Sequence, residues 1–331
     1  MTDGHHDGDH GGDPQVADRR PAAGPVEAAV LDELARSDGG LAVAVSGDRL
    51  RMLRGGGGAP DAETVVLLAG RGHAASVWFP CWAGLAARHP LLAIDLPGFG
   101  GSPMPAGAGR ADDPEVALGA FVDPVERCLA VETSAGRAAG GFALVGHSLG
   151  GLVALELARR GRLPIRRLVI IDGMGLDPRM TFASRLFFRL HPERLARWLG
   201  PRFFGRLNPG PATPLGQRVA ALEYELLTDR TAGPARVAAA RAFDRLCPWF
   251  GPVFHRGAGD GCLATPALLL WGERDPALPL ANAIAARDRW PAATLLALPA
   301  GHSPHLEAPG AVLPPLLHFL SRSLATAAAG G

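Results

Sequence analysis

The chain has 331 residues, enough for one large domain or two small ones with a sizeable buried core. Its apolar content of 47% and charged content of 20% are typical of a folded protein, and its net charge of +1 argues against nucleic acid as the main partner. The sequence contains no lysine, which excludes P-loop nucleotide binding, pyridoxal-phosphate chemistry and a serine–lysine dyad.

The N-terminal segment, residues 1–25, consists of Gly, Asp and His with hardly any large apolar side chain. We therefore expect a disordered tail, and its acidic start "MTDGHHDGDHGGD" is unlike a secretory signal. His5, His6 and His10 could bind a divalent metal ion, but a solvated tail is the better explanation, so we assign no metal site here.

Cysteine spacing and hydropathy favour a cytoplasmic protein. Cys81, Cys128, Cys247 and Cys262 show neither a CxxC nor a metal-ligand spacing, so we interpret them as free thiols in a reducing compartment. No apolar stretch approaches the roughly 18 residues that a membrane span needs. We therefore expect no membrane span.

From residue 26 on, short apolar runs alternate with longer stretches of helical periodicity. Strands are predicted at 41–45, 49–53, 64–70, 91–95, 142–146, 167–172, 267–272 and 293–298. Helices are predicted near 76–89, 114–134, 280–290 and 307–324, and from 149 onward. Strands that are apolar throughout and separated by helices form a parallel sheet covered on both faces. The predicted fold class is therefore α/β, with a mostly parallel eight-stranded sheet flanked by helices.

One long block, residues 173–262, interrupts the alternation. It contains no convincing strand but at least three helical segments, around 181–199, 214–228 and 234–246. Because the block lies between two strands of the sheet, we expect a helical cap over the carboxyl ends of the strands, where ligands bind in open α/β sheets. The predicted core then comprises 26–172 and 263–331.

The stretch "FALVGHSLGG" places Ser148 between a predicted strand and a predicted helix. Gly146 and Gly150 allow a very sharp turn there, and the turn holds the hydroxyl at a helix N-terminus that favours a developing anion. A serine that merely caps the helix would also fit this position. That alternative does not explain Gly146, Gly150 and Gly151 together, so we favour a nucleophile.

A nucleophilic serine needs a base and a third group that orients the base. "LLLWGERDPALP" ends a strand with Asp275, and "LLALPAGHSPHLEAP" ends the next strand with His302. Both loops therefore lie at the sheet edge that carries the serine, in the chain order Ser, Asp, His that this architecture requires. Asp172, at the end of "VIID", is a rival acid, and His305 is interpreted as structural.

Together these motifs resemble those of the α/β-hydrolase fold family, in its cap-bearing branch. "VGHSLGG" matches the nucleophile elbow, "IDLPGFGGSP" the loop after the fourth strand, "WGERDPALP" the acid loop and "GHSPHLEAP" the histidine loop. The likeness runs from about residue 41 to 324 and is weakest through the cap. It implies that Ser148 is the nucleophile, Asp275 the orienting acid and His302 the general base, with neither cofactor nor metal.

The sequence departs from the family pattern after the third strand, where many members have His-Gly. Here "LLAGRGHAAS" has Ala69 in place of the histidine, followed by Gly70. We expect the backbone N–H groups of Arg71 and Leu149 to form the oxyanion hole, with modified support. We expect the Arg71 side chain to point to solvent rather than into the pocket, and Asp95 to hold the "PGFGGS" loop.

The predicted cap is rich in aromatic and basic residues. It holds eight of the thirteen phenylalanines, with Trp198 and Trp249, which suggests a mostly apolar small-molecule substrate, although the rings could equally form the core of the cap. Its 13 arginines against 7 acidic residues give a charge of +6. This could favour a substrate with a carboxylate or a phosphopantetheine arm, but solvated helix faces explain it without a ligand.

We therefore expect a carboxylesterase-like or thioesterase-like enzyme that cleaves an ester, a thioester or a carbon–carbon bond next to a carbonyl through an acyl-enzyme. Two alternatives stay open. A binding or receptor protein with little or no turnover is favoured by Ala69, and a lyase or acyltransferase would use the same three residues. Serine at position 148 argues against the dehalogenases and epoxide hydrolases, for which the resemblance implies an aspartate nucleophile.

Overall fold

The computed structural model describes residues 23–37, 39–59, 61–110, 112–207, 213–229, 233–256 and 264–322, with the backbone alone for 203–207. The predicted tail up to residue 22, with its histidines, and Cys262 lie outside these ranges. No helix in the described part of the chain is both long and apolar enough to cross a bilayer.

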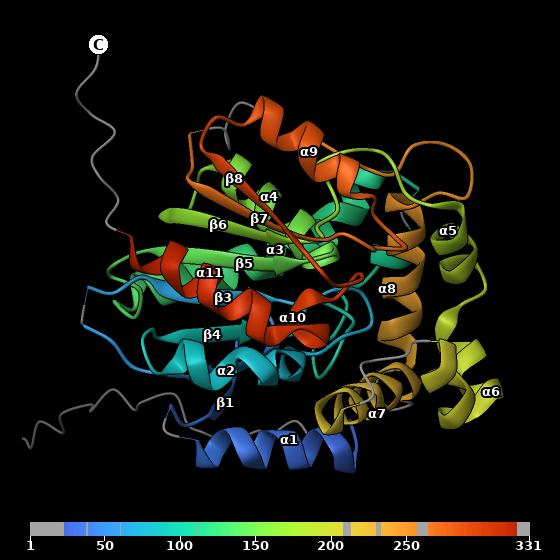
Figure 1. Ribbon diagram of the computed structural model, residues 1–331, viewed down its shortest axis with the longest axis horizontal. Helices are drawn as coiled ribbons and strands as arrows, with labels where there is room; N and C mark the ends of the chain where they lie inside the picture. The colour runs from blue at the N-terminus through green and yellow to red at the C-terminus, as the bar shows by residue number, and fades with distance from the viewer. Residues whose placement is uncertain are drawn as a thin grey trace, which may run out of the picture.

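Eight strands form one sheet in the order β1-β2-β4-β3-β5-β6-β7-β8 (Figure 1). The strands are β1 (Ala42–Val45), β2 (Arg51–Gly55), β3 (Thr64–Leu68), β4 (Leu91–Ile94), β5 (Phe142–His147), β6 (Ile165–Ile171), β7 (Ala267–Gly272) and β8 (Ala293–Leu298). Strand β2 pairs antiparallel with β1 and β4, and all other pairs are parallel. The sheet therefore confirms the predicted fold class.

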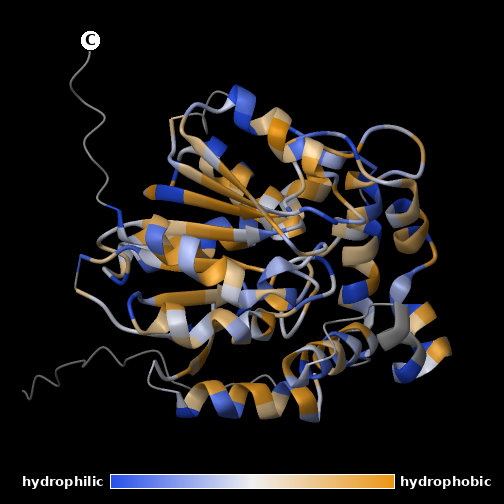
Figure 2. Ribbon diagram, in the orientation of Figure 1, coloured by the Kyte–Doolittle hydropathy of each residue, from blue (hydrophilic) through white to orange (hydrophobic). Residues whose placement is uncertain are grey.

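Helices cover both faces of this sheet, which is why its central strands are apolar along most of their length. The helices outside the segment between β6 and β7 are α1 (Pro25–Arg36), η1 (Ala75–Trp78), α2 (Phe79–Ala86), η2 (Ala108–Arg110), α3 (Pro114–Ser134), α4 (Leu149–Arg160), α9 (Leu280–Arg289), α10 (Pro304–Glu307) and α11 (Pro309–Ser321). Val66 and Leu144 pack with α3, α4 and α9, whereas their neighbours Val65 and Val145 pack with α1, α2 and α11. Figure 2 shows the strands as hydrophobic along most of their length.

Helix α1 was not predicted from the sequence, and it starts within the segment expected to be a tail. Gly24, at its N-cap position, offers no side chain to the helix N-terminus. Instead, the N–H groups of Val26 and Glu27 donate to the carboxylate of Glu225, at 3.0 and 2.7 Å. Because the start of α1 is satisfied by a residue almost 200 positions away, no local capping signal marks it in the sequence.

The segment between β6 and β7 is helical. It contains α5 (Phe182–Arg189), α6 (Pro192–Leu207), α7 (Pro214–Thr228) and α8 (Gly233–Leu246), and its described residues within 173–256 are called the helical insertion below. The helix expected over 181–199 is divided, because His191 has a positive φ of 52° between α5 and α6. No strand is found among its described residues, as predicted.

The helical insertion lies at one end of the sheet (Figure 1). Two contacts place it against loops that follow parallel strands. A Cβ added to Gly98, after β4, would meet Ala239 of α8 at 2.4 Å, and one added to Gly72, after β3, would meet Leu227 of α7 at 3.5 Å. The insertion therefore packs on the carboxyl-end loops of the sheet.

Candidate active site

Ser148 occupies a strained turn between β5 and α4. Its backbone has φ 52° and ψ −116°, a conformation that non-glycine residues rarely adopt, and its side chain caps no N–H of α4. A Cβ on Gly146 would lie 2.4 Å from the Gly150 carbonyl oxygen, and a Cβ on Gly150 would lie 2.2 Å from the Leu68 carbonyl oxygen. The glycines thus permit the turn, and helix capping does not explain the serine.

His302 and Asp275 come from the loops after β8 and β7, and the fold brings both to Ser148. His302 Nε2 lies 3.1 Å from Ser148 Oγ, and His302 Nδ1 lies 2.8 Å from Asp275 Oδ2. Asp275 Oδ1 accepts the backbone N–H groups of Ala277 and Leu278, at 2.6 and 3.0 Å. The three residues thus form one continuous line of hydrogen-bonding groups.

The two acids at this edge of the sheet have different protonation states. Burial raises the pKa of Asp275, but the charge of His302 and hydrogen bonds outweigh it and leave that pKa below its ordinary value. Burial and the negative charge of Asp275 raise the pKa of Asp172 well above its ordinary value. Asp275 is therefore the carboxylate at neutral pH, and Asp172 is a neutral carboxylic acid.

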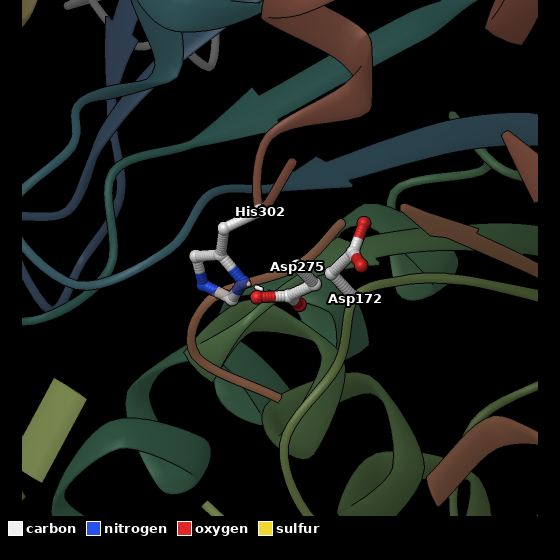
Figure 3. A group of neighbouring side chains, drawn as sticks. All are labelled: Asp172, Asp275 and His302. Carbon is white, nitrogen blue, oxygen red and sulfur yellow. Dashed lines mark hydrogen bonds and ion pairs between the residues drawn. The ribbon is translucent and has the colours of Figure 1, made fainter. Parts of the chain in front are cut away.

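Asp172 follows β6 with a positive φ of 42°, and its Oδ1 accepts the N–H of Gly272 at 2.9 Å. Figure 3 shows Asp275 between His302 and Asp172. Within the described residues no hydrogen bond joins Asp172 to His302, because both ring nitrogens of His302 are taken by Ser148 and Asp275. The structure therefore pairs the histidine with Asp275 and not with the rival acid.

The same three side chains could also hold a metal ion by distance alone. One ligand atom from each of Asp172, Asp275 and His302 lies within 4.8 Å of the others. Metal ligation requires deprotonated ligands, whereas Asp172 is neutral and His302 Nδ1 is already hydrogen-bonded to Asp275. The acid–base pair accounts for this group, and we assign no metal to it.

The loop after β3 lies directly against the nucleophile. A Cβ on Gly70 would be 3.1 Å from Ser148 Cβ and 2.9 Å from His147 Nδ1, so only glycine allows this approach. In the described chain, neither Arg71 nor Leu149 donates its backbone N–H to a turn, loop or cap hydrogen bond. These two predicted oxyanion donors therefore flank Ser148 with their N–H groups available.

The Arg71 side chain is buried, and the expectation that it points to solvent is wrong. It is 5% exposed, and its Nη2 lies 3.3 Å from Glu193 Oε2 of α6. Its guanidinium carbon lies 5.1 Å from the ring centroid of Phe188 and 5.2 Å from that of Phe243. The helical insertion covers this loop, and local sequence does not reveal such a contact.

His147, which the sequence did not single out, links the serine turn to the histidine loop. Its Nε2 donates to the His302 carbonyl oxygen at 2.8 Å, and its ring packs on His302 and His305. His305 is buried against Trp78, as the structural interpretation expects. Burial, then the charges of nearby histidines, lower the pKa of both His147 and His305 well below the ordinary value, so both are neutral.

Asp95 holds the loop after β4, as predicted. Its carboxylate accepts the backbone N–H of Gly101 at 2.7 Å and that of Ala75 at 2.6 Å. It also pairs with buried Arg51, which in turn contacts Glu27 of α1. Asp95 therefore fixes two loops beside the site and is not one of the hydrogen-bonded residues Ser148, His302 and Asp275.

The fold and the site agree with the family comparison. The chain matches the Alpha/beta hydrolase family over residues 65–314, most of its length, and belongs to that family. It is similar in fold to a bacterial membrane phospholipase A, with a TM-score of 0.63 and 24% identity over 89% of this chain and 91% of that one. It is also similar to the carboxylesterase CesB of Bacillus subtilis, with a TM-score of 0.59 and 17% identity over 89% and 97% of the two chains.

Among curated proteins, a 1-acylglycerol-3-phosphate O-acyltransferase of Arabidopsis thaliana is 28% identical over 219 residues. The match covers 60% of this chain and 50% of the relative, so this chain spans about half the length of that protein. These comparisons establish membership of the family and the fold, and leave the bond that is cleaved to be proposed from the site.

Proposed function

We propose that this protein is a serine hydrolase that cleaves an ester, a thioester or a carbon–carbon bond next to a carbonyl, in the manner of carboxylesterases and thioesterases. One observation carries the proposal: the line from Ser148 Oγ to His302 Nε2 at 3.1 Å and from His302 Nδ1 to Asp275 Oδ2 at 2.8 Å. In this line the serine has a base within reach, and the base has an ionised carboxylate that orients it.

In the proposed reaction, His302 takes the Ser148 proton while Ser148 Oγ attacks the carbonyl carbon of the substrate. The N–H groups of Arg71 and Leu149 stabilise the oxyanion of the tetrahedral intermediate. The intermediate expels the leaving group, which takes the proton from His302 and leaves an acyl-serine. Water, deprotonated by His302, then attacks the acyl-serine and releases the acid.

The helical insertion is proposed as the cap that selects the substrate. It packs on the loops around Ser148, which is only 7% exposed. Its aromatic residues differ in exposure: Phe243 is buried, whereas Trp198 and Phe250 are more than four-fifths exposed. The buried ring of Phe243 supports a largely apolar small-molecule site. The domain boundaries at 173 and 262 and the cytoplasmic location stay predictions.

An acyltransferase is the second candidate, favoured by the plant acyltransferase relative and by the low exposure of Ser148. Such an enzyme would pass the acyl group from Ser148 to an alcohol instead of to water. Turnover of an activated ester in the presence of 1-acylglycerol 3-phosphate distinguishes the two. Formation of the diacyl product at the expense of free acid would support transfer, whereas release of free acid alone would support hydrolysis.

A fluorophosphonate probe, which reacts with activated serines, tests the nucleophile directly. We expect labelling of the wild-type protein and of Ser321→Ala, which removes an exposed hydroxyl on α11, and no labelling of Ser148→Ala. Circular dichroism checks that each variant is folded. Equal labelling of Ser148→Ala would reject Ser148 as the nucleophile, and a folded wild-type protein that is not labelled would favour a binding protein.

A further inference from the structure

Arg71 is a buried cation at the contact between the sheet loops and the helical insertion. Its backbone follows Gly70, which lies against Ser148, while its side chain extends to Glu193 of α6 and the rings of Phe188 and Phe243. One residue thus offers a backbone N–H at the oxyanion position and a guanidinium within the insertion. A buried guanidinium is costly unless its charge and its donors are satisfied.

The hydrogen-bonding capacity of this guanidinium is only partly used. Arg71 Nε is buried and has no hydrogen-bond partner in the described part of the chain. The contact from Nη2 to Glu193 is 3.3 Å, longer than the 2.7–2.9 Å of a typical charge-assisted hydrogen bond. An arginine side chain has five N–H donors in a planar fork that matches carboxylate and phosphate groups.

Glu193 already occupies this position with a carboxylate. Burial raises the pKa of Glu193, but the charge of Arg71 outweighs it and keeps that pKa below its ordinary value, so the carboxylate is ionised. The second acid near Arg71, Asp244 of α8, has a pKa raised by burial in spite of the arginine. Glu193 is therefore the ionised carboxylate paired with Arg71, at a distance of 3.3 Å that leaves room for a better-placed anion.

We propose that Arg71 binds an anionic group of the substrate, a carboxylate or a phosphate, and so selects acyl compounds that carry such a group close to the scissile carbonyl. The inference rests on the proposed function and narrows its substrate class. The two phenylalanine rings fit the same assignment, because they keep water away from the guanidinium and strengthen its interaction with an anion. When substrate is absent, the Glu193 carboxylate then pairs with Arg71 in place of the substrate anion.

The alternative is that Arg71 only ties the helical insertion to the sheet through Glu193. In that case its loss would weaken turnover of charged and neutral substrates alike. Substrate-charge selectivity therefore separates the two roles. The matched substrates are p-nitrophenyl hydrogen glutarate, its 4-phosphonobutanoate counterpart, and p-nitrophenyl pentanoate, in which a methyl group replaces the anion.

For the wild-type protein, we expect kcat/KM for at least one of the two anionic esters to exceed that for the pentanoate by about ten- to hundredfold, the size expected of hydrogen bonds to a charged group. The ester that is preferred tells whether the anion is a carboxylate or a phosphate. In Arg71→Gln the ratio of kcat/KM for the preferred anionic ester to that for the pentanoate is expected to fall to about one, mainly through a higher KM for the anionic ester. The control Arg218→Gln removes a half-exposed arginine of the same insertion, paired with Glu33, and should keep the preference.

Binding to Ser148→Ala, measured by calorimetry, provides a readout that needs no turnover. We expect monomethyl glutarate to bind about ten- to hundredfold more tightly than methyl pentanoate, and Arg71→Gln in the same background to abolish the difference. Equal binding of the two compounds, or a difference that survives Arg71→Gln, would overturn the inference even where Ser148 is labelled by fluorophosphonate. Selective binding without labelling would keep the anion site and reject the hydrolase.

Discussion

Asp172 and Asp275 lie next to each other at the ends of β6 and β7, yet only Asp275 contacts His302. Asp275 Oδ2 is 2.8 Å from His302 Nδ1, whereas Asp172 accepts the N–H of Gly272. Burial, together with the charge of Asp275, raises the pKa of Asp172, whereas the charge of His302 and hydrogen bonds lower the pKa of Asp275 in spite of its burial. One acid therefore orients the histidine as a carboxylate while the other remains neutral.

This division predicts opposite outcomes for two equivalent substitutions. Asp275→Asn removes the negative charge that stabilises protonated His302, and we expect kcat to fall by roughly 10⁴-fold, the loss known for this change in other serine triads. Asp172→Asn replaces a neutral acid by a neutral amide of the same shape, and we expect kcat to stay within about tenfold of wild type. Steady-state hydrolysis of a p-nitrophenyl ester measures both.

Each variant serves as the control for the other, since both change a buried aspartate at the same edge of the sheet. Thermal unfolding shows whether either change disturbs the fold. Full activity in Asp275→Asn with a large loss in Asp172→Asn would assign the acid to Asp172 instead.

The buried imidazole of His305 makes the protein less stable as the pH falls. Because its pKa is lowered in the folded state, the unfolded chain binds a proton near pH 6.5 that the folded chain does not take up. Burial of neutral His305 therefore lowers the free energy of unfolding as the pH falls below about 6.5. The loss is up to about 1.4 kcal/mol per pH unit. Neither ring nitrogen has a hydrogen-bond partner among the described residues, so an apolar replacement removes no bond.

We therefore expect His305→Leu to gain stability relative to wild type as the pH falls from 7.5 to 5.5. Urea unfolding at several pH values gives the difference in the free energy of unfolding between the two proteins. Taking this difference separates His305 from Asp172, whose raised pKa contributes with the opposite sign in both proteins. Parallel curves for the two proteins across this range would show that folding leaves the pKa of His305 unchanged, and would contradict the prediction.

Gly150 in α4 is predicted to tolerate no side chain. Its Cβ would lie 2.2 Å from the Leu68 carbonyl oxygen, and backbone atoms cannot move aside cheaply. We expect Gly150→Ala to lower the free energy of unfolding by about 1–3 kcal/mol and to impair ester hydrolysis by displacing Ser148. Chemical denaturation and fluorophosphonate labelling measure the two effects.

Gly310 in α11 is the matched control, because a Cβ there meets no atom within 4 Å. Alanine in an open helical position removes backbone freedom from the unfolded chain, so Gly310→Ala should add about 0.5–1 kcal/mol. A Gly150→Ala protein as stable and as readily labelled as wild type would mean that β3 and α4 separate more easily than their contact suggests.

Removal of metal ions is predicted to leave hydrolysis unchanged. Asp172, Asp275 and His302 have metal-like spacing, but their hydrogen bonds and protonation states serve the acid–base pair. Dialysis against EDTA should therefore keep full ester turnover, and added Zn²⁺ should inhibit because it competes for His302 and Asp275. Activity that is lost on chelation and restored by Zn²⁺ would make this group a metal centre.

Much of the fold and of the site could be predicted from the sequence. The apolar runs at 64–70 and 142–146 and the glycines around Ser148 identify a parallel sheet with a sharp strand–helix turn, because these signals depend only on neighbouring residues. The order of Ser148, Asp275 and His302 at successive strand ends placed them at one edge, since parallel strands end on the same side.

Other features depended on long-range packing and could not be predicted. The start of α1 is satisfied by Glu225, and the break between α5 and α6 lies at the positive φ of His191. The Arg71 side chain is buried because the helical insertion folds over it, although its local sequence is polar and glycine-rich.

The sequence by itself predicted most of the elements, the sharp turn at Ser148 and the three residues proposed to react. Only the tertiary structure decided that His302 pairs with Asp275, that Asp172 is neutral and that Arg71 is buried near the nucleophile. The physical reason is that periodicity and turn chemistry act between residues close in the chain. Burial and charge interactions, in contrast, depend on every element that packs around a group.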